Sequence, residues 1–312
     1  MTPFIRVAEV WVPTEDRTQL RLSDGYYGPF DDFRALSEQT RFRPGEGLPG
    51  KAWATRHPII LKELAASNFK RAEAAEAIDL TCGVALPIFA GDLLTSVVVM
   101  LGGNTRVRAG AIELWHNDSD RFNDLRLIDG FYGAAITFEF NSRHMSFPRG
   151  YGLPGRTWKS RLPLIMKDIN NSNAFLRSQQ VDELGINAGL GIPYSSPPNQ
   201  TWILVFLVAR DTPIARRFEI WIPDKHERAL IFHSGDCDQS GQMPEELKSA
   251  VIAKGQGTIG RAWQSGIADV CANLAADTSP AGRSASAARL DATLAMPFIN
   301  DEGVKGIVAW YF

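Results

Sequence analysis

Three glycines at a fixed spacing are the first residues here whose arrangement could do chemistry. Gly45, Gly47 and Gly50 fit G-x-G-x-x-G, the turn that brings backbone N–H groups to a dinucleotide pyrophosphate. Glu63 follows 18 residues after Gly45, near the place of a ribose-binding acid. The preceding residues are polar and the following helix lasts about two turns, too short for a crossover to a parallel strand. We therefore expect no dinucleotide site, but a tight turn with positive φ and Pro49 in the first helical turn.

Arginines near predicted helices could bind an anion. Arg71 ends the stretch NFKR and Arg177 ends AFLR, each beside an apolar strand. A guanidinium there can hold a carboxylate or phosphate through two parallel hydrogen bonds, or it can pair with a nearby acid of the chain. Arg43 precedes the glycine motif, and Phe147 takes its place in a second occurrence of that motif. An anion site that uses Arg43 would therefore belong to the first occurrence alone.

Large aromatic side chains could line a pocket or anchor a core. Tryptophans recur at fixed places, and their indole N–H groups can serve either role. Tyr26 and Tyr27 alternate on a predicted strand, as do Phe131 and Tyr132, so one member of each pair should face inward. The candidate ligand-binding residues are Trp11, Tyr27, Arg43, Trp53, Arg71, Trp115, Tyr132, Trp158 and Arg177.

Catalytic and metal-binding patterns are missing from the sequence. Cys82, Cys237 and Cys271 stand apart without a C-x-x-C pair, and the five histidines are scattered. No nucleophile and base lie at a readable spacing, and no pair of acids recurs. We expect no catalytic residue and no metal site. A small redox or hydrolytic enzyme, dependent on the cysteines, is the less favoured alternative.

The glycine motif recurs, and this sets the organisation of the chain. GEGLPGKAW begins at Gly45, GYGLPGRTW at Gly150 and GQGTIGRAW at Gly255, an offset of 105 residues both times. EVW, ELW and EIW keep the same order at about the same interval. A repeat this long is a domain, because solenoid repeats span about 20–50 residues. We predict three domains, here called units 1, 2 and 3, at 1–105, 106–211 and 212–312, with unit 3 degenerate.

One unit is predicted to be a mostly antiparallel sheet with helices on its faces. Its last strand is apolar on both faces, which places it centrally in the sheet, and the short linkers should make the units pack together. The 30–39 segment could be a helix, but its counterpart 134–142 looks like a strand, so this element stays open. In unit 3 we expect the Ser- and Ala-rich segment 276–292 to be a mobile loop. The other predicted elements of unit 1 are strands at 6–13, 18–28, 58–64, 82–91 and 93–101 and a helix at 69–80.

EVWVP, RPGEGLPGKAW, HPII, FKRA and GVALPI, in this order, resemble the GAF domain. The resemblance covers units 1 and 2 and, loosely, unit 3. It implies an α/β (α+β) GAF/PAS-like fold with a central antiparallel sheet, repeated three times. It also implies a pocket between the sheet and the segment that carries the short helix. Pigment-binding members attach a bilin through a cysteine, and no cysteine here lies in such a motif, so we expect no covalent bilin; the cofactor stays unknown.

Net charge and hydropathy limit the classes of partner that we expect. The net charge of −2 gives no electrostatic reason to bind nucleic acid or a membrane. The N-terminus is no signal peptide, and the most apolar run, WILVFLVA, is too short to span a bilayer, so we expect a cytoplasmic protein. The leading hypothesis is a stand-alone sensory or regulatory protein that binds a small ligand in unit 1, unit 2 or both, and signals through a protein partner. The alternative is a ligand-free GAF-type scaffold; either form could be a homodimer.

Overall fold

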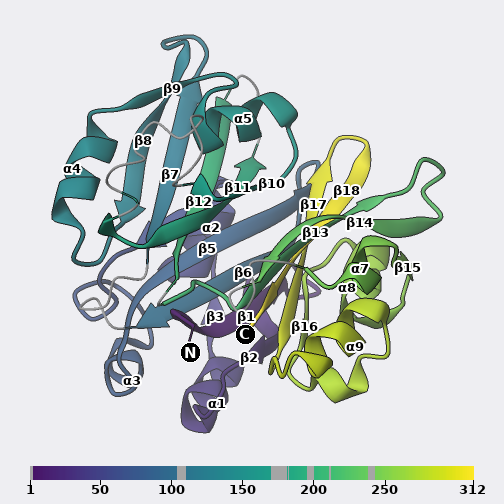
Figure 1. The fold of residues 1–312 in the computed structure, drawn as a ribbon. Coiled ribbons are helices and arrows are strands. Elements are labelled where there is room, and N and C mark those ends of the chain that lie inside the picture. Colours follow the sequence, from purple (N-terminus) through teal and green to yellow (C-terminus); the bar gives the residue numbers. More distant parts are fainter. Residues whose placement is uncertain are drawn as a thin grey trace.

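The computed structural model describes residues 3–103, 110–169, 181, 183–194, 200–210, 212–237 and 243–312. The chain forms three six-stranded sheets, one in each unit, and every strand pair in them is antiparallel. Helices cover one face of each sheet, and the opposite faces meet in the middle of the molecule (Figure 1). This is the repeated antiparallel sheet-and-helix architecture that the sequence predicts.

The sheet of unit 1 has the order β3-β2-β1-β6-β5-β4, with β1 and β6 at its centre. Its last strand, β6, is central, as its two apolar faces predict. The elements are β1 (Ile5–Pro13), β2 (Leu20–Tyr26), α1 (Asp31–Gln39), β3 (Arg41–Phe42), α2 (Gly47–Thr55), β4 (Ile59–Leu61), α3 (Ala72–Glu76), β5 (Leu80–Ala90) and β6 (Leu93–Gly103).

Unit 2 repeats this topology in the order β10-β11-β12-β7-β8-β9. Its elements are β7 (Ala111–Asp118), β8 (Asp124–Phe131), α4 (Ile136–Arg143), β9 (Ser146–Pro148), α5 (Gly152–Ser160), β10 (Leu164–Lys167), β11 (Ile186–Tyr194) and β12 (Gln200–Ala209).

Unit 3 has the order β15-β14-β13-β18-β17-β16, again the same topology. Its elements are β13 (Arg217–Pro223), β14 (Ala229–Cys237), α7 (Glu245–Lys248), β15 (Val251–Ala253), α8 (Gly257–Ser265), β16 (Asp269–Cys271), the 3₁₀ helix η2 (Leu274–Ala276), α9 (Pro280–Ala287), β17 (Thr293–Asn300) and β18 (Gly303–Tyr311).

The glycine motif enters a nine-residue helix, as the tight-turn interpretation requires. Gly45 and Gly47 have φ values of +82° and +57°, which favour glycine. A Cβ on Gly50 would lie 2.1 Å from the carbonyl oxygen of Arg43, so the backbone passes too close for any side chain. Helix α2 leads to β4, which pairs antiparallel with β5. This connection is unlike the parallel crossover of a dinucleotide-binding fold.

Each sheet is buried on both faces. On β1, Val7 and Trp11 point to the helices of unit 1, whereas Ala8 and Val10 point the other way, as the two-residue period of a strand requires. The second set joins residues of units 2 and 3, such as Leu204, in one shared hydrophobic core. The units therefore pack against one another, as their short linkers predict.

The contacts between units repeat around the molecule. Strand β4 of unit 1 packs on β7 and β8 of unit 2, and β10 of unit 2 packs on β14 of unit 3. Strand β16 of unit 3, the counterpart of β4, packs on β1 and β2 of unit 1. Polar bonds accompany the packing: Lys62 Nζ lies 2.6 Å from Asp129 Oδ1, and Ala268 N donates to Ser96 Oγ at 3.2 Å. The three units thus form a closed ring with approximate threefold symmetry.

Three expectations about local structure need correction. The 134–142 segment is not a strand: it forms α4, because Phe138 and Ser142, four residues apart, share one buried helical face. The 276–292 segment is not a mobile loop, since it contains α9. Ser279 caps this helix by accepting a hydrogen bond from Gly282 N, and Pro280 occupies its first turn. The helix predicted at 69–80 is reduced to Ala72–Glu76.

Candidate functional site

A buried carboxylate lies in the same place in all three units. Glu9, Glu113 and Glu219 have no exposed surface, and each begins an E-x-W stretch on the first strand of its unit. The tryptophan two residues on shares the strand face, so its indole Nε1 can reach the carboxylate. The Nε1–Oε2 distances are 2.9 Å for Trp11, 3.0 Å for Trp115 and 2.7 Å for Trp221.

In unit 1 this carboxylate is held by four side chains from four parts of the fold. Arg71, just before α3, donates from Nη1 to Glu9 Oε1 and from Nη2 to Oε2, the latter at 2.9 Å. Tyr27, after β2, donates its hydroxyl proton to Oε1 at 3.0 Å, and Ser37 of α1 donates at 3.2 Å. Together with Trp11, these donors satisfy both carboxylate oxygens.

The guanidinium of Arg71 is enclosed by aromatic rings. Its Cζ atom lies 5.4, 4.7 and 5.1 Å from the ring centroids of Trp11, Phe33 and Phe69. Arg71 is only 2% exposed. Burial, followed by the charge of Glu9, raises the pKa of Tyr27 well above its usual range, so the hydroxyl stays a donor. The interior between the sheet and its helices thus holds the chain's own ion pair, beside the apolar core of unit 1.

Unit 2 repeats most of this arrangement. Tyr132 donates its hydroxyl proton to Glu113 Oε1 at 3.0 Å, and Ser142 donates to the same oxygen at 3.1 Å. These residues stand where Tyr27 and Ser37 stand in unit 1. The candidate Arg177 lies outside the described residues.

Unit 3 surrounds its carboxylate with residues from other positions. Tyr311 of β18 donates to Glu219 Oε2 at 2.7 Å, and Arg217 of β13 forms an ion pair with the same carboxylate. By strand register, Arg217 stands where unit 1 has Val7, and Tyr311 where unit 1 has Leu101. Glu219, like Glu9, therefore contacts an arginine and a tyrosine. In unit 3 these two side chains come from β13 and β18, whereas in unit 1 they come from the segments before α3 and after β2.

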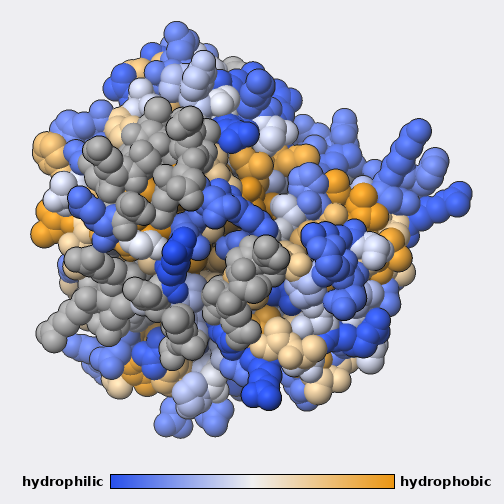
Figure 2. All heavy atoms as spheres, viewed as in Figure 1, coloured by the Kyte–Doolittle hydropathy of each residue, from blue (hydrophilic) through white to orange (hydrophobic). Residues whose placement is uncertain are grey.

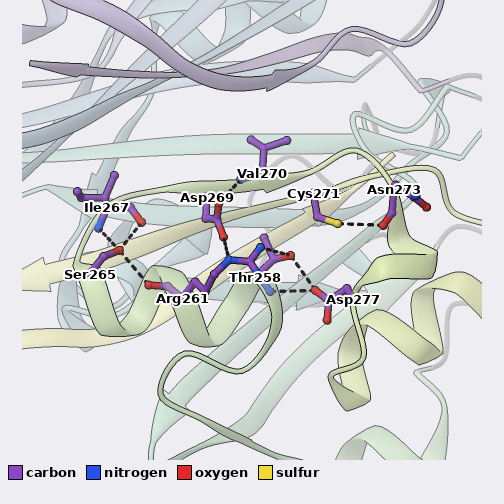
Figure 3. A network of polar contacts seen from close by, with 9 residues as sticks. All are labelled: Thr258, Arg261, Ser265, Ile267, Asp269, Val270, Cys271, Asn273 and Asp277. Carbon is purple, nitrogen blue, oxygen red and sulfur yellow. Dashed lines mark hydrogen bonds and ion pairs between the residues drawn. The ribbon is translucent and has the colours of Figure 1, made fainter.

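A second carboxylate fills the helix-covered side of unit 3, at the N-terminus of α8 (Figure 3). Asp277 Oδ2 accepts from Thr258 N at 2.9 Å and from Thr258 Oγ1 at 2.7 Å, and Oδ1 accepts from Ser279 N at 2.9 Å. Burial raises the pKa of Asp277, but the hydrogen bonds from Ser279 and Thr258 outweigh it and hold that pKa below its ordinary value. Unit 3 thus places its own anion where a helix N-terminus would otherwise face a ligand.

Single units of this chain are similar in fold to GAF domains of solved structures. The GAF domain of an Acinetobacter phosphoenolpyruvate-protein phosphotransferase is 13% identical with a TM-score of 0.25, over 32% of this chain and 56% of that chain. The A. aeolicus nlh2 GAF domain, in an inactive state, is 21% identical with a TM-score of 0.27, over 32% and 59%. Free methionine-R-sulfoxide reductase from Neisseria meningitidis, in complex with its substrate, is 14% identical with a TM-score of 0.26, over 31% and 52%. Each alignment covers about a third of this chain, which is about the length of one unit.

The likeness concerns the fold alone. Each alignment spans only a little over half the length of the solved chain. No protein-family model matches the sequence, and no curated protein matches it significantly.

The candidate residues divide into two groups. Trp11, Tyr27 and Arg71 meet at Glu9, and Trp115 and Tyr132 meet at Glu113. Ligand binding by these residues stays a prediction.

The remaining candidates lie apart from the buried carboxylates. Trp53 and Trp158 are half-buried side chains that pack against the edges of their own cores. Arg43 is exposed beside a surface groove at the edge of unit 1. Whether these three residues bind a ligand is likewise a prediction.

The glutamates and serines of these clusters were missing from the sequence-based candidates. The signal for Glu9 was present, since the acid of EVW recurs with its tryptophan in every unit. Ser37 gave no comparable signal, because it is a single hydroxyl inside a helix whose assignment was open.

Two other features bear on chemistry. Within the described ranges, no group of three or more His, Cys, Asp or Glu side chains is placed to hold a metal ion. The described helices include none with the length and apolar character needed to cross a bilayer.

Proposed function

We propose that this chain is a ligand-free GAF-type scaffold that acts as a protein-interaction module. One observation carries the proposal: in unit 1, the Glu9–Arg71 ion pair occupies the interior between the sheet and the helices, where the GAF resemblance implies a pocket. A ligand there would have to displace a bidentate ion pair and the hydrogen bonds of Tyr27 and Ser37. Leaving one of these charges buried without its partner would cost about 3–5 kcal/mol.

Unit 3 supports the same proposal by a different route. Asp277 accepts hydrogen bonds at its helix N-terminus, and its buried glutamate forms an ion pair with Arg217 and accepts a hydrogen bond from Tyr311. The backbone is fitted to this internal anion, because a Cβ on Gly257 or Gly282 would lie 2.3 or 2.5 Å from Asp277 side-chain atoms.

The surface offers apolar area for a partner. Hydrophobic surface lies over α4 at the left of the molecule (Figure 2). Ile136 and Phe140, one turn apart on α4, are 77% and 61% exposed. Unit 1 has Asp31 and Ala35 at the corresponding positions of α1. Exposed apolar residues that adjoin one another on a folded protein are typical of interaction sites.

The scaffold proposal is tested on the purified full chain. We expect a native mass equal to the chain or a whole multiple of it, and no absorption beyond that of its aromatic residues. Its melting temperature should stay constant with cyclic nucleotides, tetrapyrroles, small carboxylic acids and nitrate, because a ligand that binds only the folded state would raise it.

The contrary result is equally clear. A small molecule that co-purifies, or one that raises the melting temperature by several degrees, would contradict the scaffold. It would support the small-molecule sensor that the sequence also predicts. The variant Arg71→Ala is a useful control, since opening the interior of unit 1 should lower stability without creating affinity for any compound of this panel.

A further inference from the structure

A polar surface groove lies at the edge of unit 1, away from the buried carboxylates. It has a volume of about 550 Å³ and is open to solvent. It runs between β3, the start of α2 and the residue before Arg71. The residues that line the groove are Gln19, Gln39, Thr40, Arg41, Arg43, Glu46 and Lys70.

The groove carries an excess of positive charge in a chain whose net charge is −2. Lys70 pairs with Glu46 at 2.8 Å. In the part of the chain that the structure describes, no carboxylate lies within ion-pair distance of Arg41, Arg43 or the adjacent Arg21. The local balance is therefore three guanidinium groups without an ion pair beside the Lys70–Glu46 pair, whose carboxylate also accepts a hydrogen bond from Arg43 N at 2.8 Å.

The arginines are also placed against one another. Arg21 of β2 and Arg41 of β3 are directly opposite partners in the sheet, and both are exposed. Like charges in this position destabilise a sheet. Arg41 is held in place by bonds from its Nη1 to the carbonyl oxygens of Glu38 and Thr40, at 2.7 and 2.8 Å. An anion between these side chains would relieve the repulsion without much ordering of the arginines.

Two of the three arginines, Arg41 and Arg43, belong to unit 1 alone, whereas Arg21 has an arginine counterpart in unit 2. The corresponding cross-strand pair is Arg126 with Ser146 in unit 2 and Ile231 with Val251 in unit 3. By strand register the position of Arg43 is taken by Pro148 and Ala253. The expectation that Phe147 stands there is wrong by one residue, because Phe147 is the counterpart of Phe42. Since the three sheets share one topology, the fold itself does not require arginines here.

We infer that this groove docks an acidic segment of a partner protein, whose carboxylates pair with Arg21, Arg41 and Arg43. The inference rests on the proposed scaffold function and names the chemistry of one partner. Arginine forks bind carboxylates through paired hydrogen bonds, and clusters of arginine recognise acidic motifs in this way. An enclosed metabolite fits less well, because small-molecule sites are mostly apolar and bury most of their ligand.

The test is fluorescence anisotropy of a labelled oligoglutamate peptide with the full chain at low ionic strength. We expect saturable binding that weakens as salt screens the charges. The double variant Arg41→Gln/Arg43→Gln should bind at least about tenfold more weakly. The matched control is Arg121→Gln/Arg126→Gln, which removes the same charge from unit 2 and should leave the affinity unchanged within about twofold.

Two results would overturn the inference. One is no peptide binding by the wild type, with or without a melting temperature raised by inorganic phosphate, and the other is an equal loss of affinity in the two double variants. If the first variant is poorly folded, Arg43→Gln alone serves, since its side chain makes no described hydrogen bond, and unchanged binding by it counts against the groove. The outcome is separable from the scaffold test: a co-purified ligand would contradict the scaffold and leave peptide binding measurable.

Discussion

Glu9 and Arg71 are charged residues in the buried interior of unit 1. Apolar side chains at these positions would not carry the cost of removing a charge from water. Removing two charges from water is costly, and a buried ion pair repays this only when every donor and acceptor is well placed. Here Trp11, Tyr27 and Ser37 supply additional bonds to the Glu9 carboxylate, whereas Arg71 Nε has no hydrogen-bond partner among the described residues. We infer that the pair fixes the segment before α3 against β1, which makes one arrangement of the interior strongly preferred.

The first prediction concerns this pair. Arg71→Met should lower the free energy of unfolding by about 3–5 kcal/mol, because it leaves the Glu9 carboxylate buried without its counter-charge. Urea denaturation followed by tryptophan fluorescence measures the loss. Arg71→Lys keeps the charge and loses the bidentate geometry, so its loss should be smaller. A loss below about 1 kcal/mol for Arg71→Met is typical of an ordinary substitution and would show that the ion pair does not stabilise the fold as proposed.

The second prediction concerns Asp277. Its pKa in the folded state is lower than in the unfolded chain, so its contribution to stability is present above the ordinary pKa of 3.8 and is lost as the pH falls through the lowered value. Asp277→Asn should therefore be less stable than wild type at pH 7, and the difference should shrink below about pH 4. Urea midpoints at several pH values measure it; a constant difference across this range would refute the assignment.

Individual residues were only partly predictable. The sequence left two roles open for Arg71, an anion ligand or an internal ion pair, and the structure shows it paired with Glu9. It did not indicate which acid was the partner, because 62 residues separate them. The relocation of arginine and tyrosine to Arg217 and Tyr311 left no trace in the repeat, since it depends on which positions face each other across strands.

At the level of elements, the strands were more readable than the short helices. Alternating or continuous apolar runs predicted β1, β2, β5 and β6, and the turn chemistry of glycine predicted α2. Helix α4 has eight residues, and so does α9. In segments this short the helical and strand periods overlap, and tertiary packing decides between them.

The third prediction tests the roles of the glycines in the motif. Gly45→Ala adds a side chain into open space at φ +82°, so it should cost about 1 kcal/mol from backbone strain alone. Gly50→Ala drives a Cβ into the carbonyl oxygen of Arg43 and should cost clearly more, about 3 kcal/mol, because the backbone must move. Thermal or urea unfolding ranks the two variants, and equal losses would contradict the close-approach argument.

At the scale of the whole molecule, the shared core decides stability. Residues of all three sheets contribute to it, including Val98, Leu204 and Val308, which have no exposed surface. A unit that unfolded alone would expose the faces of the other two to water. The units should therefore not unfold independently, although each has its own smaller core on the helix side.

The fourth prediction follows. Calorimetry of the full chain should show one cooperative transition, with the calorimetric and van't Hoff enthalpies agreeing. Leu204→Ala, in unit 2, should lower the midpoint of that single transition by a loss of about 2–5 kcal/mol. Separate transitions, with only one of them shifted by Leu204→Ala, would show that the units are energetically independent.

The closed ring of units has a consequence for how the chain could be rewired. Each unit presents one edge strand to the next and receives one from the unit before, a head-to-tail contact that closes after three steps. Only two of the three junctions are covalent: unit 3 meets unit 1 through packing and hydrogen bonds, such as Ala268 N to Ser96 Oγ. The chain termini could therefore lie at any one of the three junctions without changing the contacts between the units. A circular permutant that begins at β7 and joins β18 to β1 through a linker as long as the one between β6 and β7 should rebuild the same core.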